Sequence, residues 1–387
     1  MRIVTAGIGL RSGHVLSILR KTMPEAKIVG YYDPQPSHLD MIGLETPRYP
    51  SVEDMLCDAN PDLFFVGSPN EFHLEQIALG LKAGVRIFTE KPVVVSLQQT
   101  MQLAELLAEH GSARVMVGLV LRHSQHMTDL CKALDAGVLG PIASLEANEH
   151  IAPYHGAFFM RDWRRMHGHS GGFMLEKCCH DLDLYNMITG SRPKRVASFG
   201  ARRSFLPAYA PASNSENDIF HIKKSVWNSV DDPFQSDGDI VDCQTAVVEF
   251  ESGASMSFHT NINVPDEHRR FCIIGAKGMA EGDFVRGFLK ITHRDGSVFA
   301  DHDYSNGALA DMSAHYGADH LMVQDIVAFL RQEKDALPVS IVDALEAGIG
   351  ALAIDQARVS GQIVDLSPIW AEFDSYNLPA RKDQNVG

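Results

Sequence analysis

Short apolar segments alternate with helical patterns over residues 1–120, and this alternation constrains the fold more than any other feature of the chain. The apolar segments read RIVTAGIG, KIVGYYD, DLFFVGSP, RIFTEKP and RVMVGLV, and helical patterns lie between them. Successive strands that are joined through helices run parallel, with the helices packed on the sheet. The sequence therefore predicts an α/β domain with a parallel sheet over residues 1–121.

A glycine-rich loop, GIGLRS at residues 7–12, directly follows the first predicted strand and precedes a helix expected from about Gly13. Glycines suit a tight turn in which a Cβ would keep the backbone away from a pyrophosphate bound at the helix N-terminus. An ordinary turn between strand and helix is the alternative for this loop taken alone. The cofactor contacts expected here are Gly7, Gly9, Leu10, Arg11 and Ser12.

The second predicted strand ends in Asp33, where a carboxylate can accept hydrogen bonds from the ribose hydroxyls of an adenosine. An acidic group at this position repels a 2′-phosphate, and the following residues 34–36 (PQP) supply no Arg or Lys to bind one. The glycine loop and Asp33 together predict a Rossmann domain that binds NAD rather than NADP.

The pattern changes after Arg122. Alternating runs over residues 242–264 and 269–299 read as antiparallel hairpins, and helices are expected near 124–136, 174–189, 318–331 and 342–359. The sequence predicts an α+β domain over residues 122–375. Residues 207–237 read as a long loop, and residues 376–387 as a polar C-terminal tail.

Composition limits the function classes. Hydrophobic residues make up 45% of the chain and charged residues 21%, without an apolar run long enough for a membrane span or a secretory signal, so we expect a cytoplasmic protein with no membrane partner. The net charge of −15 and the scattered basic residues argue against a nucleic-acid partner. A small-molecule ligand is the better expectation.

The six cysteines show no CxxC spacing and are expected to be thiols. Cys178 and Cys179 adjoin His180, which raises a metal hypothesis with His155 or His315 as further ligands. Neighbouring residues on a helix point about 100° apart, so Cys179 and His180 could not readily share an ion. We therefore expect core packing of the two thiols and no metal.

Three further motifs make a family resemblance specific. SPNEFH (residues 68–73) follows the third predicted strand of the pattern, TEKP (89–92) the fourth, and GGFMLEKCCHD (171–181) opens a long helix; HYGADH (315–320) precedes a later one. Over nearly its whole length the chain resembles the Gfo/Idh/MocA family, which includes glucose-fructose oxidoreductase and inositol dehydrogenases. The resemblance implies a Rossmann domain, then an open-faced, mostly antiparallel sheet that often forms the oligomer interface, with the active site between them.

The resemblance also implies roles for three residues. Lys91 would lie near the nicotinamide and bind the reacting hydroxyl, and His180 would be the acid/base. Glu176 stands where inositol dehydrogenases usually have Asp. Glu176 and His180 are four residues apart and share a helix face, so the carboxylate can orient the imidazole or hold the substrate. A histidine titrates near neutral pH and can take and return the hydroxyl proton.

Other residues are assigned to the cofactor or the substrate. Trp163 can stack on a sugar ring, and an arginine beside it can bind hydroxyls or an acid group, although a solvent-exposed amphipathic run is the alternative for residues 161–165. Asn70 and His73 could instead cap the next helix. The further cofactor contacts expected are Ser68, Pro69, Asn70, His73, Glu90 and Lys91. The substrate contacts expected are Arg122, Arg161, Trp163, Arg164, Asp183 and His315.

The leading functional hypothesis is an NAD-dependent oxidoreductase that transfers a hydride between the nicotinamide and a secondary hydroxyl of a sugar, sugar acid or cyclitol. An alternative is an NAD-dependent glycosidase that acts by transient oxidation and elimination. A third is an NAD- and sugar-binding sensor without catalysis, which would not need both Lys91 and His180. We expect a homo-oligomer, a dimer or tetramer formed through the sheet of the second domain.

Overall fold

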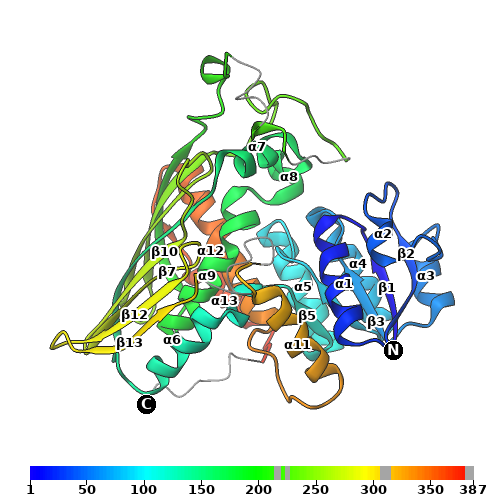
Figure 1. Ribbon diagram of the computed structural model, residues 1–387, viewed down its shortest axis with the longest axis horizontal. Helices are drawn as coiled ribbons and strands as arrows, with labels where there is room; N and C mark the ends of the chain where they lie inside the picture. Colours follow the sequence, from blue (N-terminus) through cyan, green and yellow to red (C-terminus); the bar gives the residue numbers. More distant parts are fainter. Residues whose placement is uncertain (213–218, 223–226, 306–314, 380–387) are drawn as a thin grey trace.

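The computed structural model describes residues 1–212, 219–222, 227–305 and 315–379 and contains two sheets with helices packed on and between them (Figure 1). The first sheet is parallel throughout, and its strands are, in spatial order, β2 (Lys27–Tyr32), β1 (Arg2–Ala6), β3 (Leu63–Val66), β4 (Arg86–Thr89) and β5 (Val115–Val117). Its connecting helices are α1 (Leu10–Thr22), α2 (Leu39–Ile42), α3 (Val52–Ala59), α4 (His73–Lys82) and α5 (Leu97–His110). The predicted parallel α/β domain is confirmed.

The strand order of this sheet reverses between β1 and β3, because β2 lies on one side of β1 and the other strands lie on the opposite side. Ligands of open parallel sheets bind at such a point, beside the carboxyl ends of the strands. The loops after β1 and β3 therefore stand where a dinucleotide would bind. The helix expected from about Gly13 begins at Leu10, because Gly9, with extended backbone, is its N-cap.

The second sheet has nine strands, of which β6 and β9 pair in parallel while the other neighbours pair antiparallel. In spatial order they are β13 (Val298–Asp303), β12 (Phe288–His293), β11 (Gly278–Asp283), β10 (Arg270–Gly275), β6 (Ile142–His150), β9 (Ser255–Asn261), β8 (Cys243–Phe250), β7 (Pro193–Ala201) and β14 (Val364–Asp365). This arrangement confirms the predicted, mostly antiparallel sheet.

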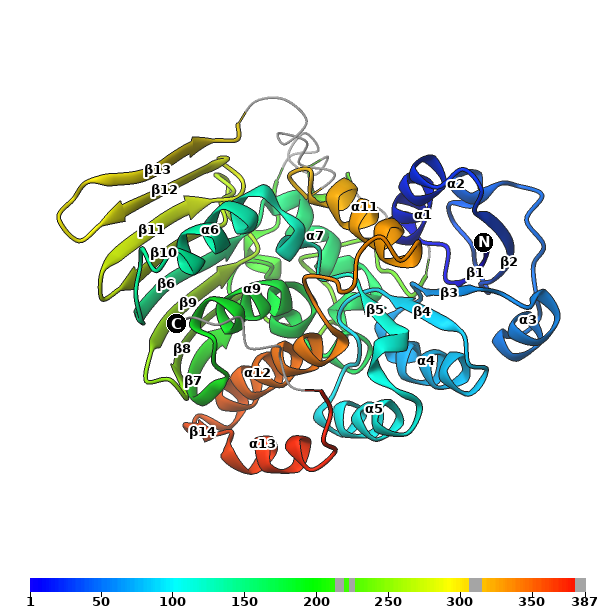
Figure 2. The ribbon, with the colours of Figure 1, turned by 90° about the horizontal axis from the view of Figure 1, so that it is seen from below.

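One face of the second sheet carries the helices α6 (Gln125–Asp135), α9 (Phe173–Thr189) and α12 (Ile341–Ser360), as Figure 2 shows from below. The other face is open, and apolar side chains lie on it: Phe199 is 77% exposed and Val247 56% exposed. Ile274 lies on the same face by strand register and is 45% exposed. The smaller helices are α7 (Pro153–Arg161), α8 (His167–Ser170) and α13 (Ser367–Asp374).

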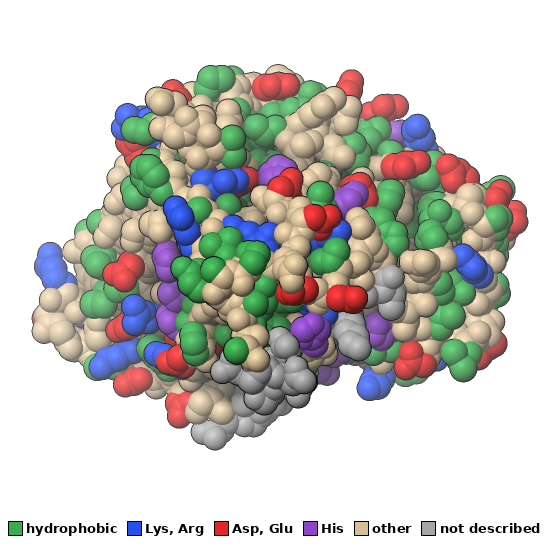
Figure 3. Space-filling view, turned by 90° about the horizontal axis from the view of Figure 1, so that it is seen from above, with side chains coloured by type: hydrophobic (Ala, Val, Ile, Leu, Met, Phe, Trp, Pro, Cys, Tyr) green, Lys and Arg blue, Asp and Glu red, His purple; other side chains and the backbone are tan. Residues whose placement is uncertain are grey.

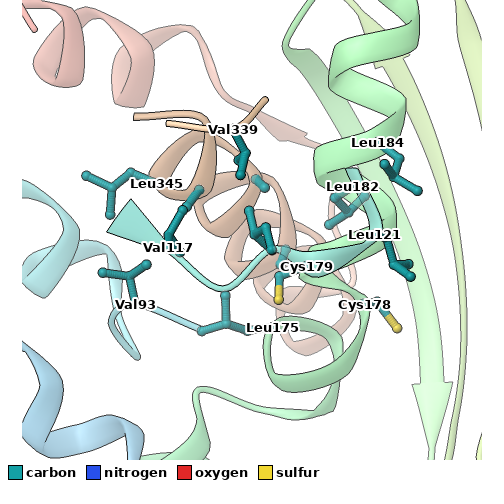
Figure 4. Packing of buried hydrophobic residues seen from close by; sticks show 14 of the residues in the cluster. Val93, Val117, Leu121, Leu175, Cys178, Cys179, Leu182, Leu184, Val339 and Leu345 are labelled. Atoms are coloured by element: carbon teal, nitrogen blue, oxygen red, sulfur yellow. The ribbon is translucent and has the colours of Figure 1, made fainter. Parts of the chain in front are cut away.

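Helix α9 is the central helix of the second domain, and 14 of its 17 residues are buried. It packs on β6 of the sheet and, along one side, against α12. Figure 4 shows Cys178 and Cys179 on this helix with their sulfur atoms pointing to different sides, each among apolar neighbours. Because buried polar groups need partners, the Glu, His and Asp side chains of α9 require a polar network around them. That network forms the candidate site.

Helix α11 (Ala318–Leu330) returns to the first sheet unit, although the predicted division places its residues in the second domain. It packs against α1, and both helices contribute to one apolar cluster, with Met322 and Ile326 of α11 beside Val15 and Leu16 of α1. The amphipathic pattern of residues 318–331 predicts the helix correctly. The pattern does not say which surface its apolar side contacts.

The described part of the predicted loop 207–237 packs on residues 161–169. Arg165 donates from Nε to Asp237 at 2.6 Å, and the Val230 amide donates to the Arg161 carbonyl at 2.9 Å. Residues 380–387 of the predicted tail lie outside the described residues. Within the part of the chain that the structure describes, no helix has the length and apolar character to cross a membrane. The cytoplasmic location stays a prediction.

Candidate active site

The glycine loop closely approaches the end of β3. Gly7 has a φ of +86°, and a Cβ on it would lie 2.4 Å from the Ser68 amide nitrogen, so only glycine fits there. The Ser12 hydroxyl contacts the same end of β3, where it donates to the Gly67 carbonyl at 3.1 Å. Small residues at positions 7, 12 and 67 therefore let α1 and β3 approach each other at the switch point.

The N-terminus of α1 forms a cradle beside Gly9. A Cβ on Gly9 would meet no atom within 4 Å, and no side chain caps the helix. The first turn of a helix presents free N–H groups and the positive end of the helix dipole. The cradle suits a pyrophosphate, as the sequence predicts. Leu10, at the same end, is 57% exposed.

Asp33 lies next to the glycine loop. Its Oδ2 accepts from the Ile8 amide at 2.6 Å, and its Oδ1 accepts from the Gln35 amide at 2.7 Å. These bonds hold the carboxylate at the end of β2, where the sequence expects it to meet a ribose. Sequence reasoning missed Arg48, which donates to the Pro34 carbonyl at 3.1 Å and so brings a cation near this position.

Glu176 is the centre of a hydrogen-bonded network between the two domains. Its Oε1 accepts from Arg164 Nε at 2.8 Å, and its Oε2 accepts from the Asn70 amide group. Lys91 Nζ donates to the Glu176 carbonyl at 2.6 Å and lies 3.7 Å from its Oε1. Burial alone would raise the pKa of Glu176, but Lys91 and Arg164 hold that pKa below its ordinary value. The carboxylate is therefore ionised and fixes Lys91 to α9.

His180 lies one turn along α9 from Glu176 and is 3% exposed. Its Nδ1 is buried and has no hydrogen-bond partner among the described residues. Burial, and after it the charges of Lys91 and Arg269, hold the pKa of His180 well below its ordinary value. The imidazole is neutral at pH 7 and can accept a proton.

Arg11 and Glu90, both expected to contact the cofactor, contact each other, with Arg11 Nε 3.2 Å from Glu90 Oε1. Arg11 Nη1 also lies 2.7 Å from Asp319 Oδ1. His315, which precedes α11, donates from Nδ1 to Asp319 Oδ2 at 3.1 Å, and its ring centroid lies 6.1 Å from that of His180. These contacts bring the glycine-loop helix, the end of β4 and the start of α11 together.

Arg122 and Asp183 were expected to bind substrate, but they bind each other. Arg122 Nε and Nη2 donate to the two carboxylate oxygens of Asp183 at 2.7 and 2.5 Å, and Nη1 donates to the Pro338 carbonyl at 3.0 Å. Both side chains are less than 5% exposed. All three guanidinium nitrogens of Arg122 thus donate to protein oxygens. The pair has a structural role, and we do not propose it as a substrate contact.

The expected sugar platform at Trp163 is also not available in this structure. Its ring is buried, and the guanidinium of Arg164 lies over it, 4.1 Å from the ring centroid. The ring centroid of Trp227, in the long loop, lies 6.3 Å from that of Trp163. Arg161 is 7% exposed. Of this group, Arg164 alone reaches the Glu176 network, where it links Glu176 to Asp162 by ion pairs of 2.8 and 2.7 Å.

The loops after β3 and β4 are braced by His73. Its ring nitrogens lie 2.9 Å from the carbonyl oxygens of Ser68 and Pro92, and its side chain is buried. The Ser68 hydroxyl donates to Gln76 at 2.8 Å, and Pro69 precedes the 3₁₀ turn Asn70–Phe72. Asn70 thereby reaches Glu176, whereas His73 acts as supporting structure.

A second charged cluster behind His180 was missed by sequence reasoning. Arg269 is 2% exposed and contacts Asp181 at 2.6 Å and Glu149 at 2.8 Å, while Lys177 lies 3.2 Å from Glu149. Burial raises the pKa of Asp181 to about 6 in spite of Arg269. Lys177 and Asp181 lie within the motif of α9, whereas Arg269 and Glu149 belong to none of the motifs.

Metal binding gains no support. Within the described ranges, no group of three or more His, Cys, Asp or Glu side chains is arranged to hold an ion. Burial raises the pKa of Cys178 and of Cys179, which suits core thiols, and all six cysteines are free. Figure 3, which views the molecule from above, shows basic, acidic and histidine side chains near one another in the middle of that face.

A nucleotide cradle at a switch point, together with a lysine of the first domain that contacts a carboxylate on a helix of the second domain, which also carries a neutral histidine, defines the class of two-domain nicotinamide-nucleotide oxidoreductases. The chain belongs to the Gfo/Idh/MocA oxidoreductase family: residues 1–119 match its NAD-binding Rossmann fold, and residues 131–359 match its C-terminal alpha/beta domain. Both the predicted family and the predicted NAD cofactor are confirmed.

Several known proteins are similar to the chain. It is 23% identical over 359 residues to a scyllo-inositol 2-dehydrogenase (NAD(+)) of Bacillus subtilis, covering 91% of this chain and 93% of that protein. It is 24% identical over 197 residues to a 2,7-anhydro-N-acetylneuraminate hydratase of Escherichia coli, covering 51% of each. The fold matches that of scyllo-inositol dehydrogenase from Lactobacillus casei with bound NAD(H) and scyllo-inositol, with a TM-score of 0.69, 21% identity and coverage of 95% and 99%.

Proposed function

We propose that the chain transfers a hydride between NAD and a secondary hydroxyl of a sugar, sugar acid or cyclitol. The observation that carries the proposal is the convergence of Lys91, Glu176 and His180 where α9 meets the end of β4. Relatives whose names specify inositol dehydrogenases support a polyhydroxylated substrate. A sensor would not need a lysine fixed to the helix that carries a neutral histidine.

The chain's own residues then handle the proton and the orientation of the substrate. NAD, when bound, accepts the hydride. Lys91, fixed by the ionised Glu176 and by the Glu176 carbonyl, donates a hydrogen bond to the reacting hydroxyl. His180, neutral at pH 7, takes the hydroxyl proton as the carbonyl forms. Arg164 and Asn70 hold Glu176 in place, so the carboxylate positions Lys91 rather than binding the substrate.

Redox-neutral cleavage or hydration is the second candidate. Here the ketone is a transient intermediate, elimination occurs beside it, and the hydride returns. The similarity to the Escherichia coli hydratase favours keeping this candidate, since that protein's name describes no net redox reaction.

Absorbance of NADH distinguishes the two candidates. The protein is incubated with NAD and, one at a time, scyllo-inositol, myo-inositol, glucose, glucuronate and 4-nitrophenyl glycosides. A dehydrogenase produces NADH with at least one polyol. Release of nitrophenol without net NADH would reject the dehydrogenase in favour of cleavage, and NAD binding without either product would favour the sensor.

Replacing Asp33 by Ala is expected to weaken NAD binding about tenfold or more, because charge-assisted hydrogen bonds contribute roughly 1.5–3 kcal/mol each and the Ile8 amide also loses its acceptor. Binding of NADP should weaken less, since a repulsive carboxylate is removed. Calorimetric titration measures both affinities. Asp58→Ala, on α3, is the matched control, and an unchanged ratio of the two affinities in Asp33→Ala would contradict the assignment.

The open face of the second sheet is the proposed subunit interface. Phe199, Val247 and Ile274 present apolar side chains on it, and large exposed apolar patches mark contact surfaces. We expect a dimer or tetramer by light scattering, and we expect Val247→Lys to shift it toward the monomer. Lys82→Glu, at an exposed position on α4 of the first domain, serves as a charge-altering control. A monomeric parent protein would refute this interface.

A further inference from the structure

The backbone before α11 is strained in a way that places one side chain at the site. His315, Tyr316 and Gly317 have φ angles of +47°, +59° and +80°, a left-handed run that only glycine adopts freely. Strain of this kind persists where the surrounding structure enforces it, and it concentrates at functional sites. Its result here is that the His315 ring lies 6.1 Å from the His180 ring, centroid to centroid.

Asp319 orients this imidazole. Its side chain is fully buried and lies 3.1 Å from His315 Nδ1 through Oδ2, while Arg11 Nη1 lies 2.7 Å from Oδ1 and holds the carboxylate in place. Arg11 Nη1 is also 3.4 Å from His315 Nδ1, but the closer carboxylate favours a proton on Nδ1. The lone pair then lies on Nε2, for which the described residues offer no hydrogen-bond partner. A carboxylate that orients a histidine in this way prepares it as a base.

His315 is a second neutral histidine at the same place. Burial lowers its pKa to about 4, against the opposing effect of Asp319. Three charged groups act on its ring: Arg11 on α1, Asp319 on α11 and Lys177 on α9. Alcohol oxidation releases one proton, which His180 can take. The reaction proposed above therefore leaves His315 without a task.

We propose that His315, oriented by Asp319, is a second base that removes a proton from the carbon next to the newly formed carbonyl, so that the site catalyses enolisation of a keto-sugar or keto-cyclitol. This inference rests on the proposed function. Two imidazoles on separate elements, so close together, can reach a hydroxyl on one substrate carbon and a hydrogen on its neighbour.

The steps balance. The carbinol hydride goes to NAD and the hydroxyl proton goes to His180, which leaves a ketone. The neighbouring C–H bond then breaks, its proton goes to His315 Nε2, and its electron pair forms the enolate. If the next carbon carries an oxygen substituent, the pair forms a C=C bond, the C–O bond breaks, and the leaving oxygen takes the proton that His315 removed from carbon. Without such a substituent, the proton returns to carbon.

Deuterium incorporation tests the inference. The full-length protein with NADH is incubated in D₂O with a panel of ketones, scyllo-inosose and 3-keto-glucose among them. Reduction is followed by absorbance, and deuterium on the carbons flanking the carbonyl is followed by mass spectrometry. For the ketone reduced fastest, we expect wild-type exchange at least tenfold above the rate without protein. His315→Gln should lower the ratio of exchange to reduction at least tenfold. Asp319→Asn should also lower this ratio.

The variants separate a catalytic role from a structural one. His315→Gln keeps the Arg11–Asp319 ion pair, and His293→Gln, at an exposed position on β12, should keep the wild-type ratio. Reduction without exchange, or a wild-type ratio in His315→Gln, would overturn the inference and leave the proposed function intact. Reduction of none of the ketones would refute both.

Discussion

Alanine at position 180 is expected to lower kcat by about two to four orders of magnitude, the range that a positioned acid/base contributes. The reason is that His180 is neutral and buried and lies one turn along α9 from Glu176, where it can take the hydroxyl proton. The affinity for NAD should change little, since the cradle at Gly9 is formed by a separate element. Steady-state kinetics with the best substrate of the panel, together with calorimetric titration of NAD, measure both quantities.

Lys91→Ala should have an effect of similar size, because it removes the donor that Glu176 holds toward the cleft. His293→Ala, at the exposed end of β12, is the matched control and should keep the wild-type kcat. If His180→Ala turned over substrate at the wild-type rate, His180 would not be the acid/base.

The largest effect on stability is expected from Arg269→Met. Loss of this guanidinium leaves Glu149 and Asp181 as buried carboxylates without their main partner, and breaking a buried ion pair costs about 3–5 kcal/mol. Urea denaturation should therefore show a lower free energy of unfolding by that amount. The double variant Arg269→Met/Asp181→Asn should recover part of the loss, because one of the two unpaired charges is removed.

Arg286→Met is the control for the stability measurement. Arg286 pairs with Asp266 at 2.8 Å, but both side chains are largely exposed, and such pairs contribute roughly 1 kcal/mol or less. Equal losses in Arg269→Met and Arg286→Met would show that the buried cluster does not stabilise the second domain in the way described.

The fold was predictable where the pattern is local. The glycine loop, Asp33 and the alternation of strands and helices specify the first sheet, and the alternating runs specify the hairpins of the second. The packing of α11 on α1 was not predictable, because an amphipathic pattern identifies a buried side without identifying its partner. Ion pairs between Arg11 and Asp319 explain part of that choice, and they join residues at opposite ends of the chain.

The site was predictable in part. Lys91, Glu176 and His180 are found together because each belongs to a motif and because a spacing of four residues puts two of them on one helix face. The pairing of Arg122 with Asp183 was not foreseen, since a buried arginine with a carboxylate partner and a substrate arginine look alike in sequence. Arg269 was missed because its carboxylate partners, Asp181 and Glu149, lie far away along the chain and only the pairing of β10 with β6 brings this region together.

The most direct test of the hydride-transfer claim uses NADH carrying deuterium at the transferable C4 position. The protein is incubated with this NADH and the ketone panel, and the alcohols formed are analysed by mass spectrometry. Wild type should place one deuterium on the former carbonyl carbon of at least one product, and His180→Gln and Lys91→Met should do so at least a hundredfold more slowly. A wild-type protein that binds NADH but labels no product, or variants that label as fast as wild type, would contradict the account.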